Sequence, residues 1–259
     1  MSLPLVDLER LRTVAETHVE AIANLAWRIC EVPAPTGQEF ERARLVVSLW
    51  EERGYTAEID GVGNVYVRRR GSAENRPLLM LMAHTDTVFP ISTPIAIRRE
   101  GDKLYGPGIS DNSVSVAVML HTFDLLDELK LETATDLLAV ANVGEEGLGN
   151  LLGACTAVER YRKELGAVLV IDGGLGHVTR GAVGSKRWRI TVRGPGGHSY
   201  GSFGTPSAIH GLSRIIAALA DIPVPQSPKT TFNVGMIEGG TSVNTIAAEA
   251  SALLDLRSS

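Results

Sequence analysis

Short apolar runs alternate with helical patterns between residues 78 and 171, and this alternation restricts the possible folds more than any other feature of the sequence. The apolar runs cover 78–83, 137–143 and 167–171, and each has the length of a β-strand. Helical spacing of apolar residues over 113–129 and 154–164 separates them. Strands joined by helices are typical of a mostly parallel mixed sheet with helices on its faces, so we predict an α/β fold.

The N-terminal part of the chain adds two helices and a hairpin. Apolar residues recur at three- and four-residue spacing over 6–30, which predicts a helix that Pro33 stops. Thr36 and Glu39 have the spacing of a capping box, so we expect a second helix that starts there and ends near Gly54. The segments 57–59 and 64–68 flank a turn at 60–63 and are typical of a β-hairpin.

The pattern of elements changes near Gly181. An alternating segment over 186–192 predicts a half-buried strand, and Thr205 with Pro206 has the pattern of a helix start. Two further strands are expected at 231–237 and 246–256. We therefore predict two domains, residues 1–182 and residues 183–259, of which the second is a smaller α+β domain.

Composition and charge exclude several classes of protein. The chain has 259 residues, a formal net charge of -5 and no long stripe of Lys and Arg, which argues against nucleic-acid binding. No apolar run approaches the roughly 18 residues of a membrane span, and residues 1–20 lack a secretory signal. We therefore expect a cytoplasmic protein that acts on a small molecule or peptide.

Acidic residues and a histidine follow the three apolar runs at the point where each run ends. These residues are His84 and Asp86 after the first run, Glu145 and Glu146 after the second, and Asp172 after the third. The carboxyl ends of parallel strands line one crevice, so we expect the five side chains to converge. Asp111, in a Gly-rich loop just before a predicted helix, is placed to join them.

Each of these features has an ordinary structural explanation when it is taken alone. His84 can be a core histidine held by Asp86, and Glu145 with Glu146 can form an exposed turn. Together, five carboxylates and one histidine without Lys or Arg partners repel one another unless a cation neutralises them. Imidazole and carboxylate without cysteine suit zinc, with manganese or cobalt as substitutes. A metal site is therefore the favoured interpretation.

Six segments resemble, in order and spacing, the motifs of one metallopeptidase family. They are His84-Thr85-Asp86, the Gly-x-x-Asp segment that ends at Asp111, Gly-Glu-Glu-Gly at 144–147, Asp-Gly-Gly at 172–174, Gly-Gly-His-Ser at 196–199 and Gly-Gly-Thr-Ser-Val-Asn at 239–244. The family is that of dizinc metallopeptidases such as peptidase T, acetylornithine deacetylase, aminoacylase and glutamate carboxypeptidase. The resemblance runs from about Leu25 to Arg257. It implies a catalytic α/β domain with an inserted lid domain that often mediates homodimer formation.

The resemblance also implies the ligands of two zinc ions per full-length subunit. Asp111 is expected to bridge the ions, His84 and Asp172 to complete one of them, and Glu146 to serve the other. Two metal ions polarise the scissile carbonyl and acidify a water molecule. Glu145 is then expected to be the general base that takes the proton of that water.

Three further residues receive roles through the same resemblance. Asp86 is expected to orient His84 and to select its tautomer. His198 is expected to reach from the lid domain, often that of the partner subunit, and to stabilise the tetrahedral oxyanion. By itself, a histidine in a Gly-rich turn is more often a surface residue. Asn244 is expected to help hold the substrate.

The sequence departs from the family pattern in two places. Residues 111–114 read Asp-Asn-Ser-Val where the family usually has Asp-x-Lys-Gly. The last zinc ligand of the family is a histidine near the C-terminus, and no histidine follows His210. The second ion then lacks a ligand. We expect these residues to belong to a chain longer by roughly a hundred residues, because a domain that stops within a predicted strand leaves apolar surface uncovered.

The predicted function is zinc-dependent cleavage of a peptide or amide bond in a small peptide or N-acyl amino acid. Within the family that the chain resembles, aspartate at position 172 favours an aminopeptidase or dipeptidase, because deacylases and carboxypeptidases more often have glutamate there. Deacylases and carboxypeptidases of the family remain the alternatives. An alternative of another class is an inactive, truncated dimerisation or binding protein, which only the missing histidine supports. A phosphoesterase is disfavoured, because no cluster of Arg or Lys lies near the strand ends to hold a phosphate.

Overall fold

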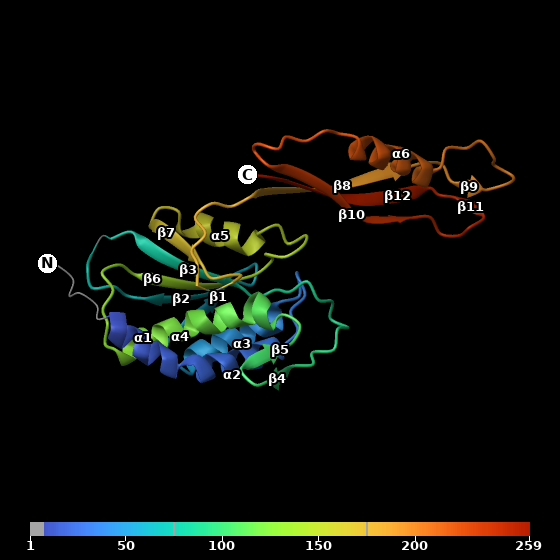
Figure 1. The fold of residues 1–259 in the computed structure, drawn as a ribbon. Helices are drawn as coiled ribbons and strands as arrows, with labels where there is room; N and C mark the ends of the chain where they lie inside the picture. Colours follow the sequence, from blue (N-terminus) through green and yellow to red (C-terminus); the bar gives the residue numbers. More distant parts are fainter. Residues whose placement is uncertain (1–7, 75, 175) are drawn as a thin grey trace. The chain divides into compact units, whose positions relative to one another are not determined.

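Residues 8–74, 76–174 and 176–259 are described by a computed structural model, shown in Figure 1. The chain divides into two compact units, Met1–Gly176 and His177–Ser259. This division lies a few residues before the predicted domain boundary at 182 and 183. Each unit has its own hydrophobic core and its own sheet.

The first unit is built on a five-stranded mixed sheet with the strand order β1-β2-β6-β3-β7. The strands are β1 Ala57–Ile59, β2 Val65–Arg69, β3 Leu78–His84, β6 Leu137–Asn142 and β7 Leu165–Val170. β3 runs parallel to its neighbours β6 and β7, whereas β1, β2 and β6 pair antiparallel. The predicted α/β fold with a mixed sheet is confirmed.

Helices cover both faces of this sheet (Figure 1). On one face lie α2 (Val19–Cys30), α3 (Phe40–Glu51) and α4 (Val114–Glu128), which share a core that includes Trp50 and Phe123. On the other face, α5 (Leu152–Tyr161) packs through Ala157 into a core with Met80 and Met82. β3 and β6 are therefore buried on both faces, which explains why they are apolar at nearly every position.

The predicted N-terminal helix is divided in two. The first two residues of the predicted range 6–30 lie outside the described residues. In the structure, α1 (Leu8–Thr17) ends directly before His18, and α2 starts directly after it. The His18 ring contacts α4, with Nε2 2.9 Å from Oε2 of Glu128 and Nδ1 3.3 Å from Nδ1 of His121. The break between the helices therefore lies where a polar side chain bonds to a neighbouring helix. Apolar periodicity does not report such a contact.

Two parts of the first unit differ from the sequence-based expectation. β7 is as apolar as β3, yet its residues after Leu165 are exposed, because β7 forms the edge of the sheet in the described part of the chain. The segment before α4, expected to be a loop, contains a hairpin of β4 (Arg98–Glu100) and β5 (Lys103–Tyr105).

The second unit is an antiparallel sheet with one helix. The sheet has the order β10-β12-β8, with β8 Gly184–Arg193, β10 Thr230–Gly239 and β12 Glu249–Ser258. α6 (Ala208–Ala220) packs through Leu212 against Ala250 and Ala252. The helix begins after Ser207 rather than at Thr205. The strand predicted at 246–256 is divided into β11 (Thr245–Ile246), which pairs with β9 (Gly197–His198), and β12.

Among the described residues, no helix combines the length and the apolar character that crossing a bilayer requires.

Candidate metal centre

The predicted ligands lie at the carboxyl ends of the parallel strands. His84 is the last residue of β3 and lies opposite Asn142, the last residue of β6. On the other side of β3, Ile171 donates its N–H to the carbonyl of Met82 over 2.8 Å, and Asp172 follows. His84 and Asp172 therefore lie at the carboxyl ends of two neighbouring parallel strands.

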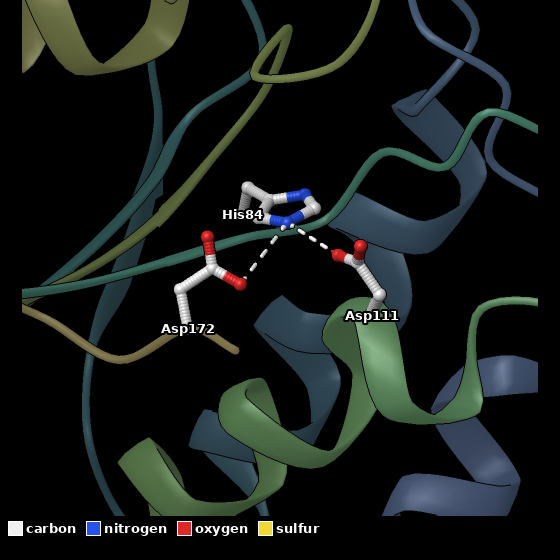
Figure 2. Close-up of side chains that lie close together, drawn as sticks. All are labelled: His84, Asp111 and Asp172. Atoms are coloured by element: carbon white, nitrogen blue, oxygen red, sulfur yellow. Dashed lines mark ion pairs between the residues drawn. The ribbon is translucent and has the colours of Figure 1, made fainter. Parts of the chain in front are cut away.

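Figure 2 shows the imidazole of His84 between two carboxylates. Its Nε2 lies 2.9 Å from Oδ1 of Asp111 and 3.9 Å from Oδ1 of Asp172. One possible ligand atom from each of these three residues lies within 4.8 Å of the others, and the same is true of His84, Glu145 and Glu146. The structure thus brings the four predicted metal ligands and the predicted base together around one imidazole.

Asp86 is buried behind this cluster, and both of its carboxylate oxygens accept hydrogen bonds. Oδ1 accepts the N–H of Glu145 over 3.0 Å. Oδ2 accepts the N–H of Glu146 over 2.9 Å and the hydroxyl of Thr36 over 2.8 Å. Nδ1 of His84 lies 3.1 Å from the main-chain carbonyl of Asp86 and 3.4 Å from its Oδ1. This pattern places a proton on Nδ1, so Nε2, which faces Asp111, is the ring nitrogen that could bind an ion.

The electrostatics of the cluster favour a bound cation. Burial lowers the pKa of His84, but a hydrogen bond to Asp86 and the charges of nearby carboxylates outweigh burial and raise that pKa to about 9. Burial and neighbouring carboxylates raise the pKa of Glu145 and of Glu146. A divalent cation relieves the same repulsion. The donor set of one imidazole and several carboxylates, without a thiolate, fits zinc, manganese or cobalt.

Asp111 reaches the cluster from the segment Ile109–Ser113, which precedes α4. Its backbone is not helical, with φ -126° and ψ 91°, and the peptide bond to Asn112 is cis. The buried Asn112 donates from Nδ2 to the carbonyl of Ile171 over 3.1 Å, which ties this segment to the residue before Asp172. Residues 112–114, which depart from the usual family pattern, therefore still leave the Asp111 carboxylate within reach of His84.

Glu39, the residue directly before α3, holds the loop that carries Glu145 and Glu146, and the sequence did not indicate this contact. The predicted capping box is wrong, because Glu39 is itself the N-cap residue and its side chain makes no cap hydrogen bond. Instead, Oε1 of Glu39 accepts the N–H of Gly37 over 2.9 Å and the N–H of Gly144 over 3.1 Å. Glu39 therefore supports the residue directly before Glu145.

Arg42, in the first turn of α3, is a buried cation next to the cluster. Its side chain is almost fully buried, and it donates from Nε to the carbonyl of Val32 over 2.8 Å and from Nη1 to the carbonyl of Thr85 over 2.7 Å. Burial lowers the pKa of Arg42 to about 10, which leaves the guanidinium charged at neutral pH. Thr85 separates His84 from Asp86, so Arg42 supports both. A charged residue on the buried face of a predicted helix was the available signal.

His198 and Asn244, the other two predicted site residues, are neighbours in the second unit. β9 and β11 pair His198 with Thr245, and the N–H of Ser199 donates to the carbonyl of Asn244 over 2.9 Å. Both side chains are exposed. Nδ1 of His198 accepts the N–H groups of Tyr200 and Gly201, each over 3.3 Å, so the ring carries its proton on Nε2.

Known proteins match both units of the chain. A model of the peptidase dimerisation domain matches residues 180–259, and a model of peptidase family M28 matches residues 64–178. A peptidase M20 domain-containing protein of Schizosaccharomyces pombe is 32% identical over 241 residues, which are 88% of this chain and 58% of that protein. The chain belongs to the M20 family of metallopeptidases. Membership in this family confirms the resemblance of the six motifs.

Solved M20 structures share the fold. Aminopeptidase PepT from Bacillus cereus aligns with a TM-score of 0.64 at 22% identity, over 93% of this chain and 66% of that one. A dinuclear metal binding peptidase of the M20 family from Bacillus subtilis aligns with a TM-score of 0.61 at 17% identity, over 94% of this chain and 65% of that one. The M20 chain described here therefore spans between 58% and 66% of the length of these three proteins.

Proposed function

We propose that this M20 protein is a zinc-dependent hydrolase that cleaves the peptide or amide bond of a small peptide or N-acyl amino acid, and that it is of the aminopeptidase or dipeptidase type. The observation that carries the proposal is that His84 lies close to two pairs of carboxylates, Asp111 with Asp172 and Glu145 with Glu146. In each set of three residues, one possible ligand atom per residue lies within 4.8 Å of the others. Asp172 and the similarity in fold to aminopeptidase PepT support the choice of an aminopeptidase or dipeptidase.

The residues of the cluster divide into metal ligands and a base. His84, Asp111 and Asp172 are proposed to hold one zinc ion, and Asp111 with Glu146 the other. When bound, zinc acidifies water and polarises the scissile carbonyl. Glu145 is proposed to take a proton from the attacking water and to pass it to the leaving amine. Its main-chain N–H is held by Asp86, while burial and the nearby carboxylates raise the pKa of its side chain, as suits a proton carrier.

The second unit is proposed to supply substrate contacts and the homodimer interface. Nδ1 of His198 accepts two main-chain N–H groups, which leaves Nε2–H as a donor for an oxyanion. Asn244 follows a glycine-rich turn beside His198 and is proposed to hold the substrate. The match to a peptidase dimerisation domain supports assembly of two copies through this unit. We propose the cytoplasm as the location of the protein.

The test of this proposal is a substrate screen of the zinc-loaded protein. Dipeptides, tripeptides and N-acetyl amino acids are incubated with protein that has been stripped with EDTA, and then with the same protein after zinc is restored; released amino acids are measured by mass spectrometry. We expect hydrolysis of dipeptides or tripeptides only after zinc is restored, because the acidic cluster needs a cation to act. A folded protein that binds zinc and cleaves none of these compounds contradicts the proposal and supports a non-catalytic binding role.

A further inference from the structure

A cavity of about 670 Å³ lies beside the acidic cluster, within the first unit. Most of its side-chain surface is apolar, from Val62, Val88, Phe89, Pro90, Leu148 and Leu152. We call this cavity the apolar pocket. Its size is in the range of ordinary small-molecule sites, and such sites are commonly apolar with a few polar groups.

The apolar pocket shares its walls with the segments that carry the acidic cluster. Gly144 and Gly147 line the pocket and directly flank Glu145 and Glu146. On the opposite loop, Thr87 lines the pocket and directly follows Asp86. The pocket and the cluster are therefore built on the same two segments, 86–87 and 144–147.

Polar groups of the lining are largely engaged within the protein. The Thr36 hydroxyl donates to Asp86, and Oε1 of Glu39 accepts two main-chain N–H groups. On Thr87, both the main-chain N–H and the carbonyl bond to the segment 34–36. Among the described residues, no Lys, Arg or His lines the pocket, and Glu39 is the one lining residue with a charged side chain. The pocket therefore offers apolar contacts and repels a negative charge.

The apolar side chains of the lining are unusually open to water. Val88 is 64% exposed and Leu148 is 61% exposed, and Leu152 is 51% exposed although it begins helix α5. An apolar group that enters the pocket removes these surfaces from water, which favours its binding. An acidic group meets the Glu39 carboxylate instead.

We propose that the apolar pocket receives the uncharged aliphatic or aromatic side chain of the substrate residue that adjoins the scissile bond, and that it discriminates against acidic side chains. This inference rests on the proposed function, because it places the scissile bond at the acidic cluster. It narrows the substrate class to small peptides with an apolar residue beside the cleaved bond.

The first test compares kcat/KM for dipeptides X-Gly and Gly-X in which X is Leu, Phe, Ala, Lys or Asp. We expect Leu or Phe to exceed Ala by about 10-fold to 100-fold in one of the two series, as is typical of hydrophobic pockets, and Asp to be the poorest substrate. The variant Val88→Ser/Leu148→Ser reduces this preference for Leu over Ala, whereas Leu8→Ser/Val158→Ser, which changes exposed residues outside the lining, keeps it. Hydrolysis with equal rates for Leu and Ala, or with Lys or Asp preferred, overturns the pocket assignment and leaves the proposed function intact.

The second test does not depend on hydrolysis. Methyl NMR spectra of the EDTA-treated protein are recorded with L-leucinamide, glycinamide and L-aspartic acid α-amide as probes. We expect L-leucinamide to shift the methyl signals of Val62, Val88 and Leu148 at lower concentration than glycinamide does, and the aspartic acid amide to shift them least. If these shifts occur but no peptide is cleaved, the preference of the pocket for an uncharged apolar side chain stands and the proposed function fails. Shifts no larger with L-leucinamide than with glycinamide overturn the pocket assignment.

Discussion

Replacing Glu145 by glutamine is expected to lower kcat/KM for peptide hydrolysis by about 10³-fold, within the range that a general base contributes, while the zinc content stays unchanged. Glutamine has nearly the same shape as glutamate but cannot accept a proton from water. The main-chain N–H of residue 145 keeps its hydrogen bond to Asp86, so the loop and the neighbouring ligands keep their positions. Steady-state kinetics and elemental analysis of the same preparation measure both effects.

Glu146→Gln is the matched control for this experiment, because it makes the same chemical change one residue further along the same loop. Glu146 is assigned to the metal ions, so its replacement is expected to lower the zinc content as well as the activity. The two assignments are contradicted if Glu145→Gln retains the activity of the unchanged protein, or if it loses as much zinc as Glu146→Gln does.

Replacing Arg42 by methionine is expected to destabilise the first unit by about 3 kcal/mol, because the carbonyls of the buried Thr85 and the half-buried Val32 each lose a hydrogen bond from a charged donor. Methionine fills much of the space of the arginine stem but donates nothing to Val32 or Thr85. Equilibrium urea denaturation of the zinc-free protein measures the free energy of unfolding. Arg42→Lys keeps the charge without the planar donor group, so an intermediate loss is expected.

Arg44→Met is the matched control for Arg42, since it lies two residues further along α3. Arg44 is exposed, pairs with Glu41 over 3.6 Å and lies over the ring of Phe40. Exposed ion pairs contribute little, so this variant is expected to change the free energy of unfolding by at most about 1 kcal/mol. Equal losses from Arg42→Met and Arg44→Met contradict the supporting role of Arg42.

The sequence predicted the convergence of the acidic cluster because that convergence follows from topology. His84 ends one strongly apolar strand, and Glu145 and Asp172 follow two others; apolar runs of this kind predict neighbouring parallel strands. Once parallel strands are adjacent, their carboxyl ends lie side by side at the same end of the sheet. Asp111 was harder to place, because its loop has no periodicity, and only the resemblance to the metallopeptidase family placed it between the ions.

The contacts that support the cluster could not be predicted in the same way. Glu39 and Arg42 act through single side-chain bonds to the main chain of distant segments, at Gly144 and Thr85. Such bonds follow no repeating pattern, and the Thr36–Glu39 spacing indicated a local capping box instead. The break at His18 is likewise not visible in the apolar periodicity, and its side chain bonds to Glu128 of α4.

The roles of His198 and Asn244 came from the resemblance alone, since two exposed polar residues in glycine-rich turns carry no distinctive pattern. Their pairing across β9 and β11 brings them together within the second unit. That pairing depends on the turn at 239–244, which brings the chain back beside β9.

Zinc content measured after gel filtration in zinc-free buffer tests the metal assignment most directly, with His84→Ala as the comparison. His84 is one of the three proposed ligands of the first ion, and its possible ligand atom lies within 4.8 Å of those of Asp111 and Asp172. The metal assignment predicts at least one zinc ion per chain in the unchanged protein and about one ion per chain less in the variant. Loss of a direct ligand is expected to cost at least as much affinity as the 10-fold to 100-fold loss that follows removal of an outer partner. A folded, unchanged protein that carries no more zinc than His84→Ala would contradict the assignment of His84, Asp111, Glu146 and Asp172 as metal ligands.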